Sequence, residues 1–344
     1  MTKRELLSFL AVKTGVNDLF GYMQKFAEQR LTILAYHRVM DVDVNNYPFD
    51  LSLISATPED FEWQLKHIKK RFTPIRFEDI INFIDQGTPL PNRPIIISFD
   101  DGFDDNYHTV FPIAKRLDVP FSVFLSTDYI GSDDTFWFEK LAYLFARSPF
   151  ESIEVGSEIK YRLSESLEDR RRSYGELVEK IKYFPQAERS LLLMGLFSRY
   201  AEVFESMPSE HKMLSSPITW EHVKEMAEWG VEFGGHGASH NILTTMSESG
   251  LRSELAGSKQ ALEKELGHFI DLFSYPNGLA EDYCNATEAA LHEEGYKTAV
   301  SYVPGSTEFK ELDTERYKLK RIHVDNDVSR DVFSIMLNFP GRVI

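Results

Sequence analysis

One short stretch constrains the fold of this 344-residue chain more than any other. Residues 95–99 (Ile-Ile-Ile-Ser-Phe) follow a proline and are almost continuously apolar, which is typical of a parallel strand buried on both faces. Asp100, Asp101 and Gly102 come next, where the strand would end. The carboxyl ends of parallel strands meet at one crevice in α/β folds, so we expect a functional site here. A bend at Gly102 would bring both carboxylates into that site.

The paired carboxylates predict a bound cation, because two such charges side by side rarely both ionise without compensation. The matching ligands are His236 and His240, which follow a strand-like segment at 231–235. A spacing of four places both imidazoles on one face of a single helical turn, within reach of one ion. With Asp101 they supply three ligands and leave a position open, which is typical of a catalytic metal site. Each motif alone is commonly a turn or a coincidence, and it is their conjunction that supports the prediction.

The sequence resembles the polysaccharide deacetylases of the chitooligosaccharide-deacetylase type, the fourth family of carbohydrate esterases. The resemblance runs from about residue 31 to residue 324. Residues 98–102 (Ser-Phe-Asp-Asp-Gly) match the family's first motif. Residues 236–240 match its second, with Gly237 where Ser or Thr is usual, and residues 273–278 look like its third. The resemblance implies a distorted parallel (β/α) barrel and metal-dependent removal of N-acetyl groups from sugars.

The resemblance also implies roles for individual residues. Asp101, His236 and His240 would hold a divalent ion, for which we expect zinc, with cobalt, nickel and iron as alternatives. The ion would polarise the acetyl carbonyl and activate a water, from which Asp100 would take a proton. The backbone N–H of Asn277 would stabilise the oxyanion.

Other assignments in the site are less direct. Tyr275, in the third motif, is predicted to contribute to substrate binding. His323, in a strand predicted at 319–324, is the preferred general acid, and His37 is the alternative. The chain departs from the family at Ser274, where an arginine commonly orients the catalytic aspartate, and the family's fourth motif is not visible.

Strand–helix units recur at roughly 30-residue spacing, which predicts a parallel sheet closed as an irregular barrel. We expect this barrel in two parts, 31–131 and 218–344, separated by an inserted α+β subdomain at 132–217. The insertion contains a hairpin followed by a charged helix predicted over 167–200. It leaves the carboxyl end of a strand and could therefore form a lid or substrate wall. Trp137 and Phe138 in it could stack on a sugar, although aromatic residues are more often core.

Residues 1–30 pattern as a helical segment that either packs on the closed end of the barrel or contacts a membrane peripherally; few basic residues favour the first. No secretory signal or membrane-spanning run is evident, so a cytoplasmic location is expected. The net charge of −16 argues against a nucleic-acid partner. The single cysteine, Cys284, excludes an intramolecular disulfide and is predicted to be buried.

We therefore expect a metal-dependent hydrolase that removes the N-acetyl group from an N-acetylated sugar, a glycan or polysaccharide precursor carried on nucleotide or lipid. One alternative is another linear or cyclic amide, or a formyl-amino sugar, at the same metal site. Another is a non-catalytic carbohydrate-binding relic, which the retained Asp-Asp and His-His pairs argue against. The sequence fixes neither the sugar nor the oligomeric state.

Overall fold

A computed structural model describes residues 3–15, 17, 29–157 and 159–339 of the chain. Seven strands form a closed parallel barrel, in which each strand pairs with the next along the chain and the last pairs with the first. The predicted α/β barrel is confirmed. In chain order the strands are β1 (Arg30–Tyr36), β5 (Pro94–Phe99), β6 (Ser122–Leu125), β9 (Glu232–Gly235), β10 (Leu272–Ser274), β11 (Thr298–Pro304) and β13 (Leu319–His323).

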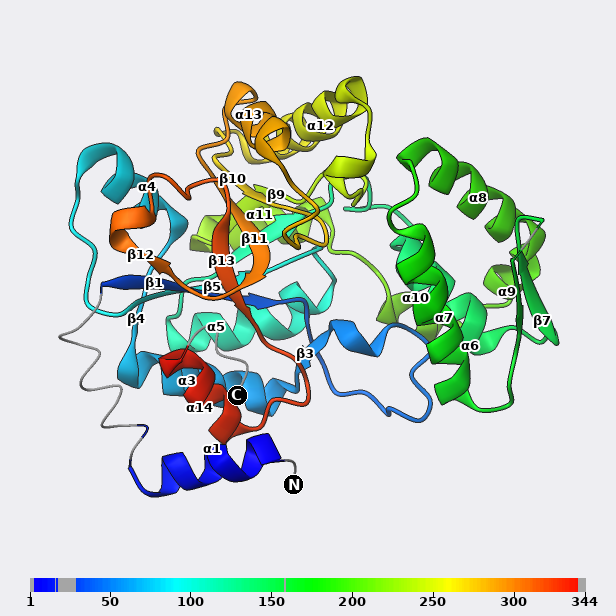
Figure 1. Ribbon diagram of the computed structural model, residues 1–344, viewed down its shortest axis with the longest axis horizontal. Helices are drawn as coiled ribbons and strands as arrows, with labels where there is room; N and C mark the ends of the chain where they lie inside the picture. The colour runs from blue at the N-terminus through cyan, green and yellow to red at the C-terminus, as the bar shows by residue number, and fades with distance from the viewer. Residues whose placement is uncertain (1–2, 16, 18–28, 158, 340–344) are drawn as a thin grey trace.

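Short strands and helices complete the barrel (Figure 1). β4 (Thr73–Pro74) pairs with β5 in parallel, β12 (Thr307–Glu308) pairs with β1 in antiparallel, and β2 (Arg38–Val39) pairs with β3 (Ile54–Ala56). The helices of this part are α1 (Lys3–Lys13), α3 (Pro58–Arg71), α4 (Phe77–Gln86), α5 (Phe111–Leu117), α11 (Trp220–Trp229), α12 (Glu248–Leu266), α13 (Asn285–Glu293) and α14 (Arg330–Asn338). Single helical turns are η1 (Leu51–Leu53), η2 (Asn106–Val110), η3 (Leu243–Thr245) and η4 (Phe309–Glu311).

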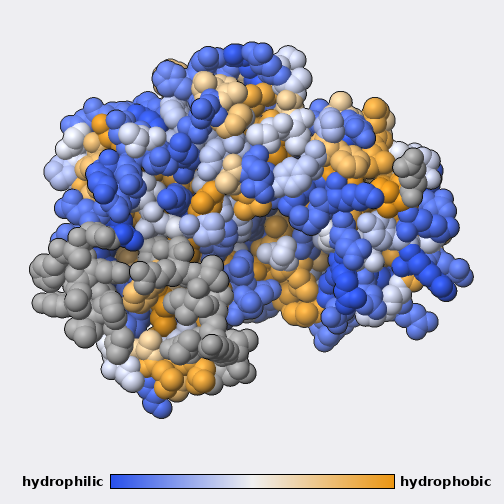
Figure 2. Space-filling model, viewed as in Figure 1, coloured by the Kyte–Doolittle hydropathy of each residue, from blue (hydrophilic) through white to orange (hydrophobic). Residues whose placement is uncertain are grey.

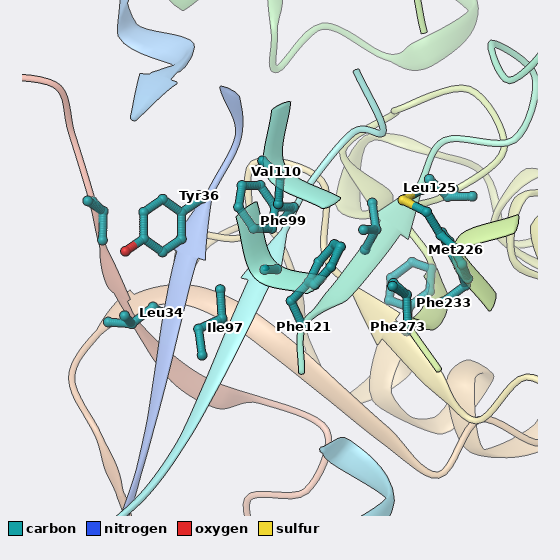
Figure 3. Packing of buried hydrophobic residues seen from close by; sticks show 14 of the residues in the cluster. Leu34, Tyr36, Ile97, Phe99, Val110, Phe121, Leu125, Met226, Phe233 and Phe273 are labelled. Carbon is teal, nitrogen blue, oxygen red and sulfur yellow. The ribbon is translucent and has the colours of Figure 1, made fainter. Parts of the chain in front are cut away.

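The barrel strands are buried on both faces, as the apolar run at 95–99 predicted. Alternate residues of β1 and β5 join the main hydrophobic core with residues of α3, α5, α11 and α12. Figure 3 shows Leu34, Tyr36, Ile97 and Phe99 within this core. Residues on the opposite face of the same strands join a second cluster with Phe77, Ile80 and Ile81 of α4. The barrel wall is therefore held rigidly, and its carboxyl ends can carry a site with fixed geometry.

Residues 137–214 form a mixed subdomain beside the barrel, drawn in green in Figure 1. Its elements are α6 (Trp137–Arg147), the hairpin β7 (Ser152–Val155) and β8 (Ile159–Arg162), α7 (Leu167–Ile181), α8 (Gln186–Arg199), α9 (Ala201–Glu205) and α10 (Ser209–Leu214). Its hydrophobic cluster also includes Tyr47, Phe49 and Ile54 from the segment that precedes α3. The single helix predicted over 167–200 is wrong, because Pro185 lacks an N–H and separates α7 from α8.

The N-terminal helix α1 lies beside α14 (Figure 1), while much of the predicted segment 1–30 lies outside the described residues. No described helix is long and apolar enough to cross a membrane. The face shown in Figure 2 is largely hydrophilic, with scattered apolar residues. The burial predicted for Cys284 is wrong, because it is the exposed residue that precedes α13.

Candidate metal centre and active site

Asp101 turns its carboxylate toward two imidazoles at the carboxyl end of the barrel. Its Oδ1 lies 3.5 Å from Nε2 of His236 and 3.2 Å from Nε2 of His240. Both carboxylate oxygens are buried and accept no hydrogen bond from the described residues. A buried carboxylate in this state is costly unless a cation completes it. Two nitrogens and one oxygen within 4.8 Å of one another fit a divalent metal ion, as the sequence predicted.

The backbone at Asp101 explains how two adjacent carboxylates share a site. Asp101 has a φ of +74° and Gly102 a φ of +87°, so the chain leaves the strand in a left-handed turn. The bend therefore begins one residue before the predicted Gly102. A Cβ at Gly102 would lie 2.5 Å from Leu125 Cδ2 of β6, so the Leu125 side chain would have to shift, and the positive φ favours glycine as well.

The helical turn predicted for residues 236–240 is wrong, because this segment is a loop after β9. Gly237 and His240 have φ values of +73° and +57°, which a helix does not allow. The amide of Ser239 donates to Oε1 of Glu254 on α12 at 2.7 Å instead of to a helical carbonyl. The two imidazole centroids lie 4.9 Å apart, so the loop brings both rings to Asp101 by a different route.

A second contact fixes the orientation of His236. Its Nδ1 lies 2.8 Å from the carbonyl oxygen of Ser274 at the end of β10. If Nδ1–H donates to this carbonyl, the Nε2 lone pair faces Asp101 and is free to bind a metal. Burial lowers the pKa of His236 to about 4, so the ring is neutral and able to act as a ligand near pH 7.

Arg321 of β13 holds Asp100, and the sequence reasoning missed it. Its Nη1 and Nη2 donate to the two oxygens of Asp100 at 2.8 and 2.7 Å, and its Nη2 also donates to Ser274 Oγ at 3.0 Å. The arginine absent at position 274 is thus supplied by another strand. Burial alone would raise the pKa of Asp100, but Arg321 and His236 hold it well below its ordinary value. One feature of the sequence indicates that Arg321 faces the site. It stands two residues before His323, and residues two apart on a strand share a face.

A cavity of about 400 Å³ opens over these groups. Seven of the eight predicted site residues line it: His37, Asp100, Asp101, His236, His240, Asn277 and His323. Tyr275, which was predicted to contribute to substrate binding, does not line the cavity. Its buried ring packs on Tyr283, with centroids 4.7 Å apart, and belongs to the hydrophobic core. It follows the inward-facing Ser274, so its side chain points to the other face of the strand.

His323 lies at the end of β13 and stacks on the ring of Tyr302. Its Nε2 is buried and makes no hydrogen bond with the described residues. Burial lowers the pKa of His323 to about 3, and the nearby Arg321 adds to the effect. The imidazole is therefore neutral in the free site and can accept a proton before it donates one.

The insertion supplies the opposite wall of the cavity, through Trp137 and Phe138 of α6 and through α7. The Phe138 ring centroid lies 5.0 Å from that of His240. Lys182 is paired with Glu179 at 2.8 Å, and both residues line the cavity. The buried Nε1 of Trp137 has no hydrogen-bond partner among the described residues. The wall thus combines aromatic surface with an unused donor, which is how proteins commonly bind small polar ligands.

A buried polar chain connects the insertion to the loop that carries the histidines. Arg189 of α8 donates to Asn241 Oδ1 and to the Lys182 carbonyl. Asn241 in turn donates to Ser239, whose hydroxyl lies within 3.0 Å of both oxygens of Glu254. Ser239 and Asn241 flank His240, so the contact of Arg189 with Asn241 lets the insertion help fix the loop conformation.

Comparison with known proteins agrees with the geometry. A family model described as polysaccharide deacetylase matches residues 87–299. The chain is 29% identical over 323 residues to the putative polysaccharide deacetylase YxkH of Bacillus subtilis, covering 94% of this chain and 81% of that protein. It is 27% identical over 140 residues to the poly-beta-1,6-N-acetyl-D-glucosamine N-deacetylase of Staphylococcus epidermidis. That match covers 38% of this chain and 47% of the relative, so the matching region spans about half of the relative's length.

Two solved structures share the fold. The Streptococcus pyogenes deacetylase PplD, in complex with acetate, superposes with a TM-score of 0.57 at 17% identity and covers 89% of this chain and 97% of its own. The Bacillus cereus polysaccharide deacetylase BC0361 also superposes with a TM-score of 0.57, at 19% identity, and covers 90% of this chain and 69% of its own. At these identities the likeness concerns the fold alone.

Proposed function

Because this chain belongs to the polysaccharide deacetylase family, we propose that it is a metal-dependent hydrolase that removes N-acetyl groups from an N-acetylated glycan. One observation supports this most strongly. The unpartnered carboxylate of Asp101 faces two imidazole nitrogens, and Asp100, held by Arg321, lines the same cavity. A carbohydrate-binding relic would have no use for an ion-ready triad beside an oriented carboxylate.

A divalent ion held by Asp101, His236 and His240 would act as a Lewis acid on the acetyl carbonyl and would activate water at neutral pH. We propose zinc first, since imidazole and carboxylate ligands suit it, and cobalt, nickel and iron are the alternatives. The residues present fit such an ion, because two imidazole nitrogens and a carboxylate oxygen lie within 4.8 Å of one another.

Asp100 is the proposed base. The bidentate contact with Arg321 fixes its orientation and keeps it ionised, so it is ready to accept a proton from the attacking water. The same contact lowers its basicity, so Asp100 would hold the proton only briefly and release it within the site.

His323 is the proposed carrier of a proton to the departing amine, with His37 as the alternative. Both imidazoles line the cavity. His323 is neutral when the site is free, so it would gain its proton during the reaction and then release it to the amine nitrogen. The backbone N–H of Asn277, at the cavity edge, is the proposed donor to the oxyanion.

The cavity lining favours a glycan over a phosphate-linked sugar. Three carboxylates besides Asp100 and Asp101 line it, those of Asp50, Glu179 and Asp325. One lysine and one arginine line the cavity, and both already have partners. Lys182 pairs with Glu179, and Arg189 donates to Asn241. A diphosphate would therefore meet negative charge without a free cation. The cytoplasmic location stays a prediction.

Acetate release from a panel of substrates tests the proposal. The panel should hold poly-β-1,6-linked and β-1,4-linked N-acetylglucosamine oligomers, a nucleotide-linked N-acetylhexosamine, a formyl-amino sugar and a small cyclic amide. We expect acetate from at least one oligomer and none from the Asp100→Asn and His236→Ala variants. Asp313→Asn and His292→Ala, at exposed positions, are matched controls that should keep wild-type activity.

Two results would contradict the proposal. Hydrolysis of the cyclic amide or the formyl sugar without acetate release from any oligomer would assign the site to another amide. Failure of every substrate in the metal-loaded wild type would favour a binding role.

A further inference from the structure

A second cluster of metal-ligand type lies outside the cavity. Asp104, His108 and His222 bring one carboxylate and two imidazoles together, with ligand atoms all within 4.8 Å of one another. Asp104 Oδ2 lies 3.4 Å from His108 Nε2, and its Oδ1 lies 3.4 Å from His222 Nδ1, which also accepts the N–H of Thr219 at 3.4 Å. None of the three residues lines the catalytic cavity. The donor set is the same as that of the catalytic triad.

Two separate segments supply these ligands, the stretch 104–108 and α11. Asp104 lies in the loop after β5, where its N–H donates to the carbonyl of Ser216. His108 lies in η2, a π-helical turn whose N–H groups at positions 107 and 108 both donate to the Asp104 carbonyl. π-helical turns are rare and occur frequently at functional sites. His222 comes from α11, more than 100 residues later, so the cluster is formed by the fold and not by local sequence.

Packing fixes the orientation of the His222 ring. It stacks on Tyr107 with centroids 4.0 Å apart and an interplanar angle of 5°. The Tyr107 hydroxyl is held by Glu225 at 2.5 Å. The His108 ring stands edge-on to His222, with centroids 5.2 Å apart. A ring held in this way loses little conformational entropy when it binds an ion.

The exposure of the cluster also allows a cation to enter. The His222 side chain is 22% exposed. Asp104 is half-buried between the two histidines. His108 is 59% exposed at its side chain, so an ion could enter from solvent and keep waters in its remaining positions.

We propose that Asp104, His108 and His222 form a second binding site for a divalent transition-metal ion of the zinc, cobalt or nickel type. The ion clamps two segments that carry the catalytic ligands. Asp104 lies three residues after Asp101 in the same loop, and α11 leads through β9 to His236. An ion shared by both segments stabilises their relative position and therefore the catalytic site.

Metal stoichiometry tests this site independently of activity. Chelator-treated protein is dialysed against cobalt or zinc, and bound metal is counted by atomic emission. We expect two ions per chain in the wild type, one in His108→Ala, one in His236→Ala and none in the double variant. His292→Ala, an exposed histidine on α13, is the matched control and should keep both ions.

The outcomes separate this proposal from the function proposed above. Equal metal content in the wild type and His108→Ala overturns the second site, whatever the activity. Loss of one ion in His108→Ala alone, with no acetate released by the wild type, supports the second site and contradicts the deacetylase. Asp104→Asn gives an independent check, since it removes the carboxylate without removing a histidine and should also lose one ion.

Discussion

At the scale of single residues, the sequence predicted the ligands but not the groups that position them. Asp101, His236 and His240 converge as their motifs implied. The spacing of Arg321 and His323 placed both on one strand face but did not reveal the partner of Arg321, because barrel closure brings β13 beside β1 and across from Asp100. Tyr275 was misassigned because a motif does not reveal to which face of a short strand each residue points.

The Arg321–Asp100 contact gives a prediction. Arg321→Lys keeps a positive charge but cannot form the bidentate contact, so Asp100 loses its fixed orientation. We expect kcat for acetate release to fall about 100-fold, while bound metal and KM stay near their wild-type values. Ser274→Ala removes a single hydrogen bond to the same guanidinium and should cost less than about 10-fold. Equal kcat values in Arg321→Lys and the wild type would show that the bidentate contact with Asp100 does not contribute to catalysis.

A buried carboxyl at the junction of barrel and insertion gives a prediction about pH. Glu139 of α6 is fully buried, accepts the N–H of Asp50 at 3.0 Å and lies 3.6 Å from Arg38 Nη1. Burial raises the pKa of Glu139 to about 8. A raised folded pKa means that the stabilisation is complete below the unfolded value near 4.5 and is lost as pH rises through 8.

Urea unfolding at pH 6 and pH 8 measures this effect. We expect the wild type to lose on the order of 2 kcal/mol of unfolding free energy from this group between the two pH values. Glu139→Gln keeps an acceptor for the Asp50 N–H and should show a smaller loss. The assignment fails if the variant and the wild type lose the same amount.

At the scale of elements, the spacing of the second motif identified the two histidines that reach Asp101. The helical turn expected from that spacing was wrong. A His-x₃-His pair suits a helix, but the loop after β9 is shaped by Glu254, which follows much later on α12. Similarly, the predicted single helix over 167–200 overlooked the break at Pro185. Local pattern identifies residues that can bind a metal, and tertiary contacts decide how the backbone presents them.

A substitution at Gly237 tests whether the conformation of the loop at 236–240 is needed for metal binding. The family usually has Ser or Thr here, but a Cβ at Gly237 would lie 2.7 Å from Glu254 Oε1, and its φ is +73°. We expect Gly237→Ala to weaken metal binding at His236 and His240 and to destabilise the protein by more than about 1 kcal/mol. Gly257→Ala is the control, because the nearest neighbour of its Cβ is Ala238 at 4.0 Å, an ordinary contact. Unchanged metal affinity in Gly237→Ala would show that the loop adapts.

At the scale of the whole molecule, the periodic strand–helix pattern was sufficient for the barrel, because buried parallel strands have a distinctive apolar run. The start of the insertion at the carboxyl end of a strand predicted its place on the active-site side, but the side-chain contacts that hold it there, such as Arg189 with Asn241, have no sequence signature. The structure shows that the insertion forms one wall of the cavity.

A substitution at Trp137 tests whether the wall formed by the insertion binds substrate. We expect Trp137→Ala to raise KM for an N-acetylated oligomer by about 10-fold, because stacking surface is lost. Hydrolysis of a small aryl acetate, which is too short to reach the wall, should change much less. An equal effect on both substrates would indicate a general loss of site geometry instead of a binding role for the ring.

The central claim is that the ion at Asp101, His236 and His240 supports deacetylation. The most direct measurement is acetate release from an N-acetylated oligomer as a chelator-treated protein is titrated with zinc or cobalt. We predict no activity without metal and a linear rise that parallels the ions bound at this triad, with none regained by His236→Ala. Full activity after complete removal of metal, or activity restored in His236→Ala to the wild-type level, would contradict the account.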